Sequence, residues 1–388
     1  MKEIIYITPV LVPGSSAASR RILANAKLIQ LLNYKVEIYS GLNISEKQLV
    51  DGVTVIPSGV GIEESNGLKK LLAYRKSVLY FIETITKQDL NNLKGIILYS
   101  GYSFYLSPLL RWCKKNRIPL IFDSVEWYTP TKFYHWFFKP YFWNTEVAMR
   151  YFIPKTKNVI TISTFLDKYY REKKCTTVIL PPLFYEKLNK KKSYRKSSLK
   201  LSYTGSPGKK DNLNQVIEAI LELNNEKKSK IIQFEVAGIT PNQLLNYKAF
   251  KEKNIRNLPE NFITYGYVSM KKAQEITVNS DFSILFRKQD KTNTAGFPTK
   301  IVESLSLGTP ILLNYSSDLH LYLHDNINAV VIDDFEITTI KKAINRILEM
   351  PTKKLDEMTK NALETADKNF LISSKKMTMN TFLKQIKI

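Results

Sequence analysis

A cation and a carboxylate stand three residues apart in the stretch Pro298-Thr299-Lys300-Ile301-Val302-Glu303, directly after Gly296-Phe297. Pro near a helix start and Gly308 just past its end predict a short helix here. The first N–H groups of such a helix, together with its dipole, favour a phosphate. Lys300 and Glu303 could then hold the two ends of a nucleotide diphosphate. The alternative is a weak surface pair on an ordinary helix.

A second stretch suited to phosphate has a strand–loop–helix pattern and reads LKLSYTGSPGKKDNLNQVIEAI from Leu199. Gly205 and Gly208, on either side of Ser206 and Pro207, let the backbone approach a ligand, and Lys209 or Lys210 could reach phosphate oxygens as a point charge. The loop is neither a Walker loop nor a GxGxxG fingerprint, so a solvated basic loop is the alternative. Arg287, at the end of the strand that enters the Lys300 motif, is another candidate for the diphosphate charge.

Polar side chains also follow two predicted strands in the first half of the chain. Gly14 lies in a PGSS turn that leads into a helix with Arg20 and Arg21 in its early turns. Asp123 and Glu126 lie just past another strand, at the edge where ligands bind in open α/β sheets. Glu126 could orient an acceptor, whereas Asp123 could equally be an N-cap.

Composition excludes several classes of protein. At 388 residues the chain is too long for one ordinary domain, and 44% hydrophobic residues are enough to build real cores. Two isolated cysteines and three histidines offer little for a structural metal or a Ser-His-Asp relay, so we predict no metal and a reducing compartment. The start, MKEIIYITPV, predicts a buried strand rather than a signal peptide. No apolar run reaches the roughly 18 residues of a spanning helix, so we expect a soluble or peripheral protein.

The net charge of +23 is concentrated in the first half and in a basic segment after it. Residues 1–182 carry 25 Lys/Arg against 13 Asp/Glu, residues 183–200 carry 7 against 1, and the remainder 26 against 21. This distribution predicts an anionic partner, such as lipid head groups or a polyanionic glycan. The alternative is a Lys- and Asn-rich composition that reflects the base bias of the genome.

Ten aromatic side chains cluster with Lys within residues 127–143. Such a mixture suits a bilayer interface, and a buried aromatic helix packed on the sheet is the alternative. Single-stranded nucleic acid also fits this composition, but without an RRM, KH or OB pattern we expect no nucleic-acid partner.

Strand and helix patterns alternate throughout, which predicts two Rossmann-like domains with parallel sheets. We place a first domain over residues 1–182, a basic linker over 183–200, a second domain over 201–365 and a terminal helix over 366–388. The predicted strands are apolar runs, and they lie at 4–7, 36–39, 53–57, 95–99, 119–122, 159–162, 199–203, 231–236, 262–265, 282–286, 310–313 and 329–332.

The segments around 199–211 and 281–314 resemble retaining glycosyltransferases with the GT-B fold, in particular family 4, the glycosyl transferases group 1. That family carries an E-x7-E motif, of which Glu303 matches the second Glu while Ala295 stands in place of the first. A subset reads P-[ST]-K-x-x-E, which Pro298 to Glu303 match. Lys210 aligns with the diphosphate-binding Lys of the family, and the family reads the nucleobase with backbone at the position of Gly266, Tyr267 and Val268. Tyr267 could also be no more than a packed aromatic.

The resemblance implies two domains facing a central cleft, with the terminal helix crossing back to the first domain. It implies sugar transfer from a nucleotide-diphospho-sugar, with UDP-sugars favoured, by front-face attack with retention. The sequence shows no convincing DxD metal motif, since Asp333-Asp334 are adjacent and read as a turn, so we expect no metal or other cofactor. The donor site would comprise Gly14, Gly205, Ser206, Lys209, Arg287, Gly266, Tyr267, Val268, Gly296, Phe297, Pro298 and Thr299, with Lys300, Glu303, Lys210 and Glu126 as catalytic residues.

We expect the acceptor to be a glycan or a lipid-linked glycan of bacterial capsule or other surface polysaccharide, at the cytoplasmic face of the plasma membrane. The alternatives are a non-catalytic homologue that acts as a scaffold at the membrane, or a sugar-nucleotide epimerase of the same fold. An epimerase would need acid/base carboxylates and histidines in the cleft, and the three histidines are poorly placed for that role.

Overall fold

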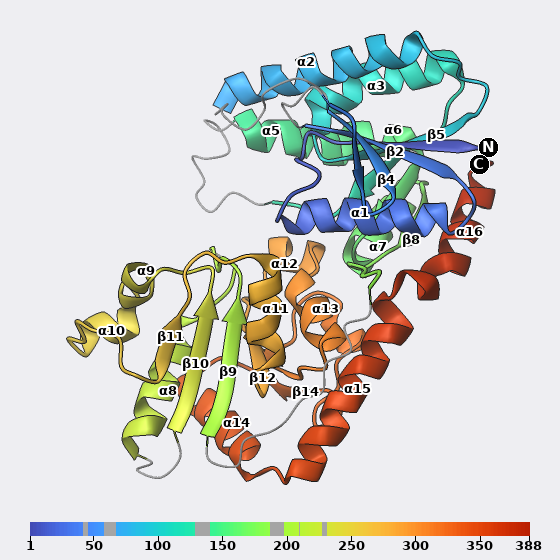
Figure 1. The fold of residues 1–388 in the computed structure, drawn as a ribbon. Helices are drawn as coiled ribbons and strands as arrows, with labels where there is room; N and C mark the ends of the chain where they lie inside the picture. Colours follow the sequence, from blue (N-terminus) through green and yellow to red (C-terminus); the bar gives the residue numbers. More distant parts are fainter. Residues whose placement is uncertain (42–45, 58–66, 129–139, 187–197, 209, 227–230) are drawn as a thin grey trace. The chain divides into compact units, whose positions relative to one another are not determined.

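The computed structural model describes residues 1–41, 46–57, 67–128, 140–186, 198–208, 210–226 and 231–388. These residues form two compact units, each built on its own sheet with helices on the faces (Figure 1). The first comprises Met1–Tyr185, Thr294–Phe297 and Leu371–Ile388, and the second comprises Glu186–Asn293 and Pro298–Phe370. Two α/β units with parallel sheets are the fold class that the sequence predicts, and this prediction is confirmed.

The sheet of the first unit has eight strands in the order β3-β4-β2-β1-β5-β6-β7-β8. Neighbouring strands are parallel except for β3 and β4, which pair antiparallel at one edge. Because both faces of a parallel sheet are covered, its strands are continuous apolar runs, and Ile4 to Ile7 are at most 1% exposed. The strands are β1 (Glu3–Ile7), β2 (Lys35–Ser40), β3 (Gln48–Val50), β4 (Val53–Pro57), β5 (Leu93–Tyr99), β6 (Leu120–Ser124), β7 (Asn158–Thr161) and β8 (Thr176–Ile179).

The helices of the first unit include two from the far end of the sequence. Met379, Phe382, Leu383, Ile386 and Ile388 join the core that β1, β2 and α1 build. The helices are α1 (Ala17–Gln30), α2 (Gly67–Thr86), α3 (Tyr102–Asn116), α5 (Pro140–Val147), the π-helix η1 (Ala148–Phe152), α6 (Ile153–Thr156), α7 (Thr164–Glu172), the 3-10 helix η3 (Ile372–Lys375) and α16 (Lys376–Gln385).

The second unit has a six-stranded, fully parallel sheet in the order β11-β10-β9-β12-β13-β14. Its strands are β9 (Ser198–Thr204), β10 (Ile231–Ala237), β11 (Phe262–Thr264), β12 (Phe282–Leu285), β13 (Ile311–Asn314) and β14 (Ala329–Ile332). Its helices are α8 (Asn214–Glu226), α9 (Pro241–Leu245), α10 (Lys248–Glu252), α11 (Met270–Val278), α12 (Lys291–Ala295, whose last two residues group with the first unit), α13 (Thr299–Ser306), the 3-10 helix η2 (Leu319–Leu321), α14 (Ile337–Glu349) and α15 (Thr352–Phe370).

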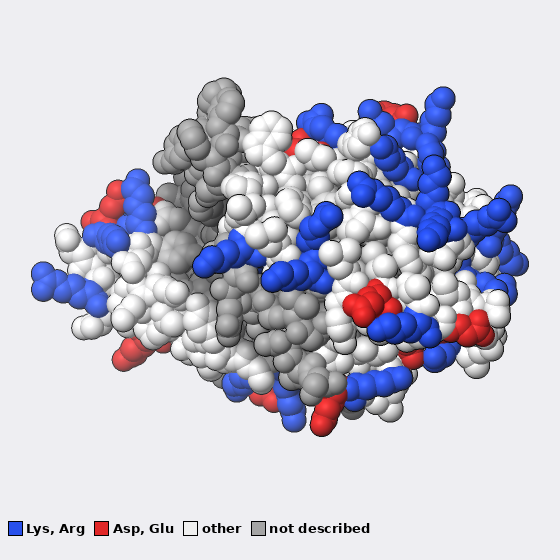
Figure 2. Space-filling model, turned by 90° about the horizontal axis from the view of Figure 1, so that it is seen from above, with Lys and Arg blue, Asp and Glu red and all other residues white. Residues whose placement is uncertain are grey.

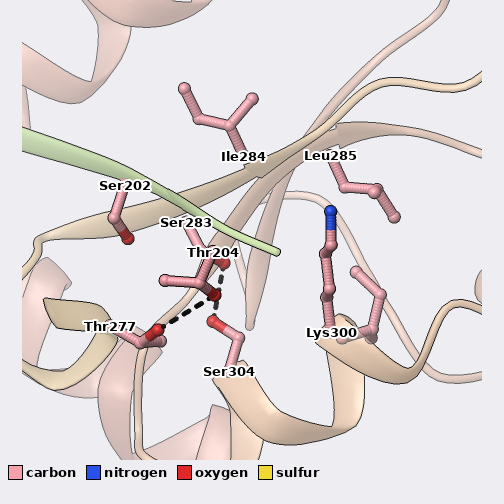
Figure 3. A pocket seen from close by; sticks show the side chains of 9 residues that line it. Ser202, Thr204, Thr277, Ser283, Ile284, Leu285, Lys300 and Ser304 are labelled. Carbon is pink, nitrogen blue, oxygen red and sulfur yellow. Dashed lines mark hydrogen bonds between the residues drawn. The ribbon is translucent and has the colours of Figure 1, made fainter. Parts of the chain in front are cut away.

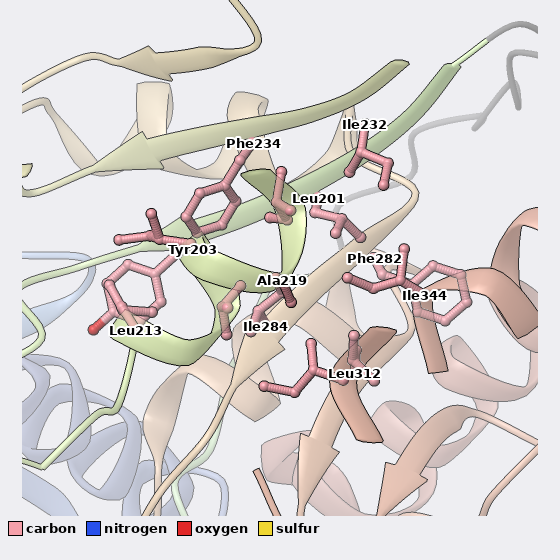
Figure 4. Packing of buried hydrophobic residues seen from close by; sticks show 14 of the residues in the cluster. Leu201, Tyr203, Leu213, Ala219, Ile232, Phe234, Phe282, Ile284, Leu312 and Ile344 are labelled. Atoms are coloured by element: carbon pink, nitrogen blue, oxygen red, sulfur yellow. The ribbon is translucent and has the colours of Figure 1, made fainter. Parts of the chain in front are cut away.

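One hydrophobic core holds the second sheet to helices α8 and α14 (Figure 4). Leu201 and Phe282 on the central strands are fully buried, as is Ile344 on α14. Tyr203 lies at the end of β9 with only 1% of its surface exposed, and its hydroxyl points away from the apolar cluster (Figure 4). The core therefore anchors the strand ends from which the loops of the candidate site leave.

All twelve predicted strands are present, each within two residues of its expected bounds, so these predictions are confirmed. The sequence analysis missed β3 and β8. The edge strand β3, QLV, has only three residues, which is too short an apolar run to identify a strand, and Leu49 at its centre is 76% exposed. The strand β8, TTVI, carries only two aliphatic residues.

Two further expectations on secondary structure and packing need correction. The single helix expected over 366–388 is instead the end of α15 followed by η3 and α16, because the extended backbone of Leu371 interrupts it. Trp127 fits the buried alternative given for the aromatic cluster rather than a bilayer interface, because it is 3% exposed and its indole N–H donates to Glu146 at 2.6 Å. Residues 129–139 of that cluster and 187–197 of the predicted linker lie outside the described residues.

Candidate functional site

Glycines end two neighbouring strands of the second sheet and bring their backbones into contact. Gly205 follows β9 with φ of +114°, and Gly238 follows β10 with φ of +89°. A Cβ on Gly238 would lie 2.7 Å from the carbonyl carbon of Gly205, and a Cβ on Gly205 would lie 2.9 Å from Cε of Lys300. The bare backbone at Gly205 therefore leaves room for the Lys300 side chain to lie across the loop.

Lys300 is positioned by the helix that carries it. It lies in the first turn of α13, whose N-cap is Pro298. Ser304, one turn later on the same side of the helix, shares a hydrogen bond of 2.6 Å with Ser283 on β12 and donates to the Thr309 carbonyl at 2.8 Å. Because residues four apart lie on one helix face, these bonds direct Lys300 toward the ends of the strands.

Asp211 is the centre of the charged cluster at these strand ends, and the sequence analysis gave it no role. Lys300 Nζ lies 2.6 Å from its Oδ2, and Arg287 Nε lies 2.6 Å from its Oδ1. The Tyr203 hydroxyl donates to Oδ2 at 2.6 Å, and Lys300 Nζ also lies 3.6 Å from the centroid of the Tyr203 ring. The Asp211 side chain is only 2% exposed, so this carboxylate is buried beneath the two cations.

Backbone bonds hold the other members of the cluster in place. The Arg287 N–H donates to Asn314 Oδ1 at 2.9 Å, and the amide of Asn314 donates back to the Arg287 carbonyl at 2.9 Å. The N–H of Asn212, next to Asp211, donates to the Phe286 carbonyl at 2.8 Å. The cluster is thus built from the ends of three adjacent strands, β9, β12 and β13, rather than from mobile side chains on a surface.

The pKa shifts of the three titratable members follow from this burial. Burial alone raises the pKa of Asp211, but Lys300 and Arg287 outweigh it, so the pKa is lowered from its ordinary value. Burial lowers the pKa of Lys300 to about 8, and Asp211 offsets this only in part because Arg287 repels the same ammonium. Burial and then Asp211 raise the pKa of Tyr203 well above 10, so its hydroxyl stays neutral and donates.

The surroundings therefore act differently on the charged forms of Asp211 and Lys300. The charged form of Asp211 is favoured, whereas the charged form of Lys300 is disfavoured relative to water, because burial removes its solvation and Arg287 repels it. Lys300 and Arg287 share a single negative charge, that of Asp211. The pair is therefore suited to bind a further anion, such as a phosphate.

A small polar hollow lies beside Lys300 under the strand ends (Figure 3). Its volume is about 10 Å³, which is room for one water. Thr204 and Thr277 share a hydrogen bond of 3.4 Å at its wall. The hollow is too small for a ligand, so it belongs to the support of Lys300 rather than to a binding pocket.

A larger cavity of about 280 Å³ opens beside the same loop. It is lined by Ser206, Pro207 and Gly208 of the loop and, among others, by Tyr247 and Tyr267. Tyr267 is 70% exposed, and Gln243 donates to its hydroxyl at 3.4 Å, so it is not a packed core aromatic. The cavity thus offers an exposed aromatic ring and a Gly-rich loop to a planar group.

The structure brings part of the predicted donor set together in the second unit. Lys300 and Arg287 meet at Asp211, Gly205 lies beside Lys300, and Ser206 and Tyr267 line the larger cavity. Lys210 is half-buried immediately before Asp211 in the chain, and Glu303 is half-buried on α13. The half-buried Gly266 and Val268 flank Tyr267.

Other predicted residues belong to the first unit or lie outside the description. Lys209 lies outside the described residues. Gly296 and Phe297 group with the first unit, whereas Pro298 and Thr299 begin α13 in the second. Gly14, in the turn before α1, and Glu126, half-buried two residues after β6, both belong to the first unit.

The structure corrects the roles that the sequence analysis offered for Asp123. Both alternatives for Asp123, ligand-facing carboxylate or N-cap, are wrong, because its side chain is 0% exposed and pairs with Arg21 at 2.7 Å. Tyr6 and Asn25 also donate to this carboxylate. A buried ion pair with such partners is structural, and it ties β6 to α1.

Asp211 and Tyr203 are the residues that sequence reasoning missed. The signal available was their place in the strand–loop–helix pattern: Tyr203 is next to the last residue of β9, and Asp211 ends the loop that follows. The sequence suggested no role for Asp211, because an acidic residue is not expected to bind an anion. Its pairing with Lys300, 89 residues away, is not visible in the sequence.

Comparison with known proteins adds to this geometry. The sequence model of the family described as Glycosyl transferases group 1 matches residues 185–365. No curated protein matches the sequence.

Several solved structures share the fold over nearly the whole chain. Sucrose-phosphate synthase from Thermosynechococcus elongatus has a TM-score of 0.73 at 13% identity, covering 100% of this chain and 99% of that one. HepE from Anabaena in complex with UDP has a TM-score of 0.65 at 13% identity, covering 99% and 100%. A trehalose-6-phosphate protein from E. coli bound with UDP-2-fluoro glucose has a TM-score of 0.69 at 11% identity, covering 99% of each chain. At these identities the likeness establishes the fold.

Proposed function

We propose that this protein, whose residues 185–365 match the sequence model of the glycosyl transferases group 1, transfers a sugar from a nucleotide-diphospho-sugar, most readily a UDP-sugar, to a glycan or lipid-linked acceptor. The observation that carries the proposal is the pair of buried cations, Lys300 and Arg287, that share Asp211 beside the cavity of about 280 Å³. UDP and UDP-sugars bound to proteins of the same fold support the choice of donor.

In this proposal the diphosphate lies against the cations, and the base lies in the cavity beside Tyr267. Negative charge develops on the leaving diphosphate as the sugar bond breaks, so Lys300 and Arg287 act where that charge appears. Lys210 and the N–H groups at the start of α13 would add to this field. Glu303, one turn after Lys300, would bind a hydroxyl of the donor, and Glu126 would orient the acceptor from the first unit.

We further propose that transfer proceeds with retention and without a metal. Among the described residues, no three His, Cys, Asp or Glu side chains gather into a group that could hold a metal ion. In this proposal Lys300 and Arg287 stabilise the leaving group, and the leaving phosphate accepts the acceptor proton on the front face. The site of the missing first Glu, Ala295, is 0% exposed, so the donor sugar would be held by other groups.

Turnover in a purified sample tests this proposal. We expect UDP, among UDP, GDP, CDP and ADP, to raise the thermal unfolding temperature most. We expect slow release of UDP from a UDP-sugar without acceptor, unaffected by EDTA, and loss of most turnover in Lys300→Ala. Lys341→Gln, which breaks a surface ion pair with Glu222 and Glu226, is the matched control and should leave turnover unchanged.

The alternative function is a non-catalytic homologue that binds a nucleotide-sugar and acts as a scaffold. The loss of the first Glu at Ala295 favours it, while the retained Lys300 and Glu303 of the family motif oppose it. A thermal shift with UDP but no hydrolysis or transfer of any UDP-sugar would support the scaffold. No shift with any nucleoside diphosphate would overturn both functions.

The acceptor reaction, by this proposal, takes place at an anionic membrane surface in the cytoplasm, as part of the assembly of a surface polysaccharide. In the described part of the chain, none of the helices combines the length and apolarity that crossing a bilayer requires. The basic excess of residues 1–182 supports attachment to the bilayer by charge.

A further inference from the structure

Helix α2 of the first unit exposes leucines along one line of its outer face. Leu68 is 59% exposed, Leu72 is 49% and Leu79 is 46%. Their spacing of four and seven residues places them on one stripe of a helix. The opposite side of α2 is buried in the unit, through Leu71, Tyr74, Val78 and Phe81. The helix is therefore apolar on both faces, which its role in the core of the first unit does not require.

Basic side chains flank the leucine stripe, and acidic ones are almost absent. Helices α2 and α3, which pack side by side, together carry seven Lys or Arg and one Glu. The single acid, Glu83, already forms an ion pair of 2.9 Å with Lys87. Lys69, Arg75 and Lys76 are exposed beside the leucines. Figure 2 looks down on the face of α2 and α3, where Lys and Arg far outnumber Asp and Glu.

We propose that the outer face of α2 docks the protein on the surface of an anionic lipid bilayer. At 20 residues, α2 is about 30 Å long, so it can lie in the plane of the interface. In that orientation the leucines enter the boundary between head groups and acyl chains, and the flanking cations meet anionic head groups. The inference concerns binding alone, and it does not depend on the transferase reaction.

The neighbouring helices add aromatic side chains of the kind found at bilayer interfaces. Trp143, Val147 and Tyr151, spaced four residues apart along α5 and η1, are 49%, 39% and 56% exposed. Lys155 lies 3.5 Å from the centroid of the Tyr151 ring. Helix α5 packs against α2. Trp and Tyr beside Lys are typical of the head-group level of a membrane.

The charge of α2 argues against a second copy of the chain as the occupant. In a two-fold dimer the same face of each copy would meet, so Arg75 and Lys76 would approach the basic face of the other copy. Like charges brought together in this way oppose association. Nucleic acid is also a poor match, because the leucines, rather than the cations, occupy the centre of the face.

Vesicle co-sedimentation of the full-length protein tests the proposal. We expect binding to phosphatidylcholine vesicles that contain phosphatidylglycerol, weak binding to phosphatidylcholine alone, and a loss of binding as salt increases. Replacing Lys69, Arg75 and Lys76 together by Gln should weaken binding by about fivefold per cation removed. As a control, Lys353, Lys360 and Lys368, exposed on α15, are replaced by Gln and should leave at least most of the binding.

The apolar part of the face is tested with Leu72→Gln and Leu79→Gln in one variant, against Leu321→Gln, which is 50% exposed in the second unit. We expect the α2 variant to lose most of its vesicle binding while thermal unfolding and the UDP-dependent thermal shift stay unchanged. Equal binding of neutral and anionic vesicles, or full binding by both α2 variants, would overturn the proposal. A dimer in solution that the leucine variant dissociates would assign the face to a second copy instead.

Discussion

Asp211 joins two cations and a phenol that the sequence places in three separate motifs. Its partners come from residues 203, 287 and 300, and each lies 2.6 Å from one of its oxygens. Because the carboxylate is 2% exposed, the cations cannot turn to water without leaving it unpaired. At the scale of single residues, Asp211 therefore holds Lys300 and Arg287 in one place when no other anion is bound.

The lowered pKa of Lys300, about 8, predicts the pH dependence of donor binding. Below this value Lys300 already carries its proton, so the affinity for UDP should be level. Above it the proton must be taken up on binding, because the diphosphate favours the charged form, and the dissociation constant should rise by about tenfold per pH unit until the pKa of the bound state is reached. Calorimetric titration with UDP between about pH 7 and 10 measures this. A UDP affinity of the wild type that does not change with pH would contradict this prediction. As a control, Lys300→Met should bind UDP weakly, with an affinity that does not change over the same pH range.

Replacing Asp211 by Asn removes the charge while keeping the shape. Since Asp211 raises the pKa of Lys300, we expect the UDP affinity of Asp211→Asn to begin falling at a lower pH than in the wild type. We also expect a loss of about 2 kcal/mol of unfolding free energy at pH 7, because two buried cations lose their partner. The pKa of the carboxylate is lowered in the folded protein, so this loss should shrink as the pH falls below the ordinary value of 3.8 and vanish only below the lowered pKa.

Denaturant unfolding and the UDP titration together measure both effects. Lys341→Gln breaks an ion pair that is more exposed, and it should cost less than about 1 kcal/mol. If Asp211→Asn cost no more than this control and left the pH profile in place, Asp211 would have no positioning role.

The ends of strands position the site at the scale of elements. β9, β12 and β13 are adjacent and parallel, so their carboxyl ends deliver Tyr203, Arg287 and Asn314 to one edge of the sheet. Helix α13 is fastened to β12 through Ser283 and Ser304. Gly205 leaves the space that Lys300 occupies. The arrangement depends on elements 89 residues apart in sequence, between Asp211 and Lys300.

Gly205→Ala should displace Lys300 as well as strain the backbone. The added Cβ would lie 2.9 Å from Lys300 Cε, at a φ of +114° that side chains rarely adopt. We expect a loss of about 1–3 kcal/mol from the backbone and, in addition, a loss of most UDP affinity. Gly52→Ala is the matched control, because its φ is +80° and nothing lies within 4 Å of the added Cβ. If both variants kept full UDP affinity, the approach of Lys300 to the loop would not matter for binding.

The strands were predicted well from the sequence, whereas the side-chain contacts between elements were predicted less well. Continuous apolar runs such as Ile4 to Ile7 identify buried parallel strands, because both faces of the sheet are covered. The Pro298–Glu303 motif and the loop at Gly205 identified the two chain segments of the site. The pairing of Lys300 with Asp211, and of Arg21 with Asp123, could not be read from the sequence, since a buried ion pair leaves no periodic pattern. Asp211 and Lys300 stand 89 residues apart in the sequence, and Arg21 and Asp123 stand 102 residues apart.

The whole molecule is not a simple succession of domains along the chain. Residues 371–388 group with residues 1–185, although the entire second unit lies between them in sequence. Ile372 donates its N–H to the Phe184 carbonyl at 3.0 Å, and Ile388 packs near Gly95. The first unit is therefore built from three separate stretches, including Thr294–Phe297.

Phe382, 2% exposed in the core of the first unit, is expected to stabilise that unit and not the second. Phe382→Ala should cost about 3–4 kcal/mol of unfolding free energy. Amide hydrogen exchange should show the lost protection in strands such as β8, against which α16 packs. Met377→Ala, on the same helix and 76% exposed, should change nothing. Loss of protection in β9 to β14 instead would contradict this division of the molecule.

The return of residues 371–388 to the first unit has a consequence for synthesis on the ribosome. When residues 1–185 leave the exit tunnel, their core still lacks Met379, Phe382, Leu383, Ile386 and Ile388. Domains generally fold as units in the order in which they are made, but here the first unit made is the one that must wait. Until residues 371–388 have also left the exit tunnel, an apolar gap in the nascent first unit stays open to water and to chaperones.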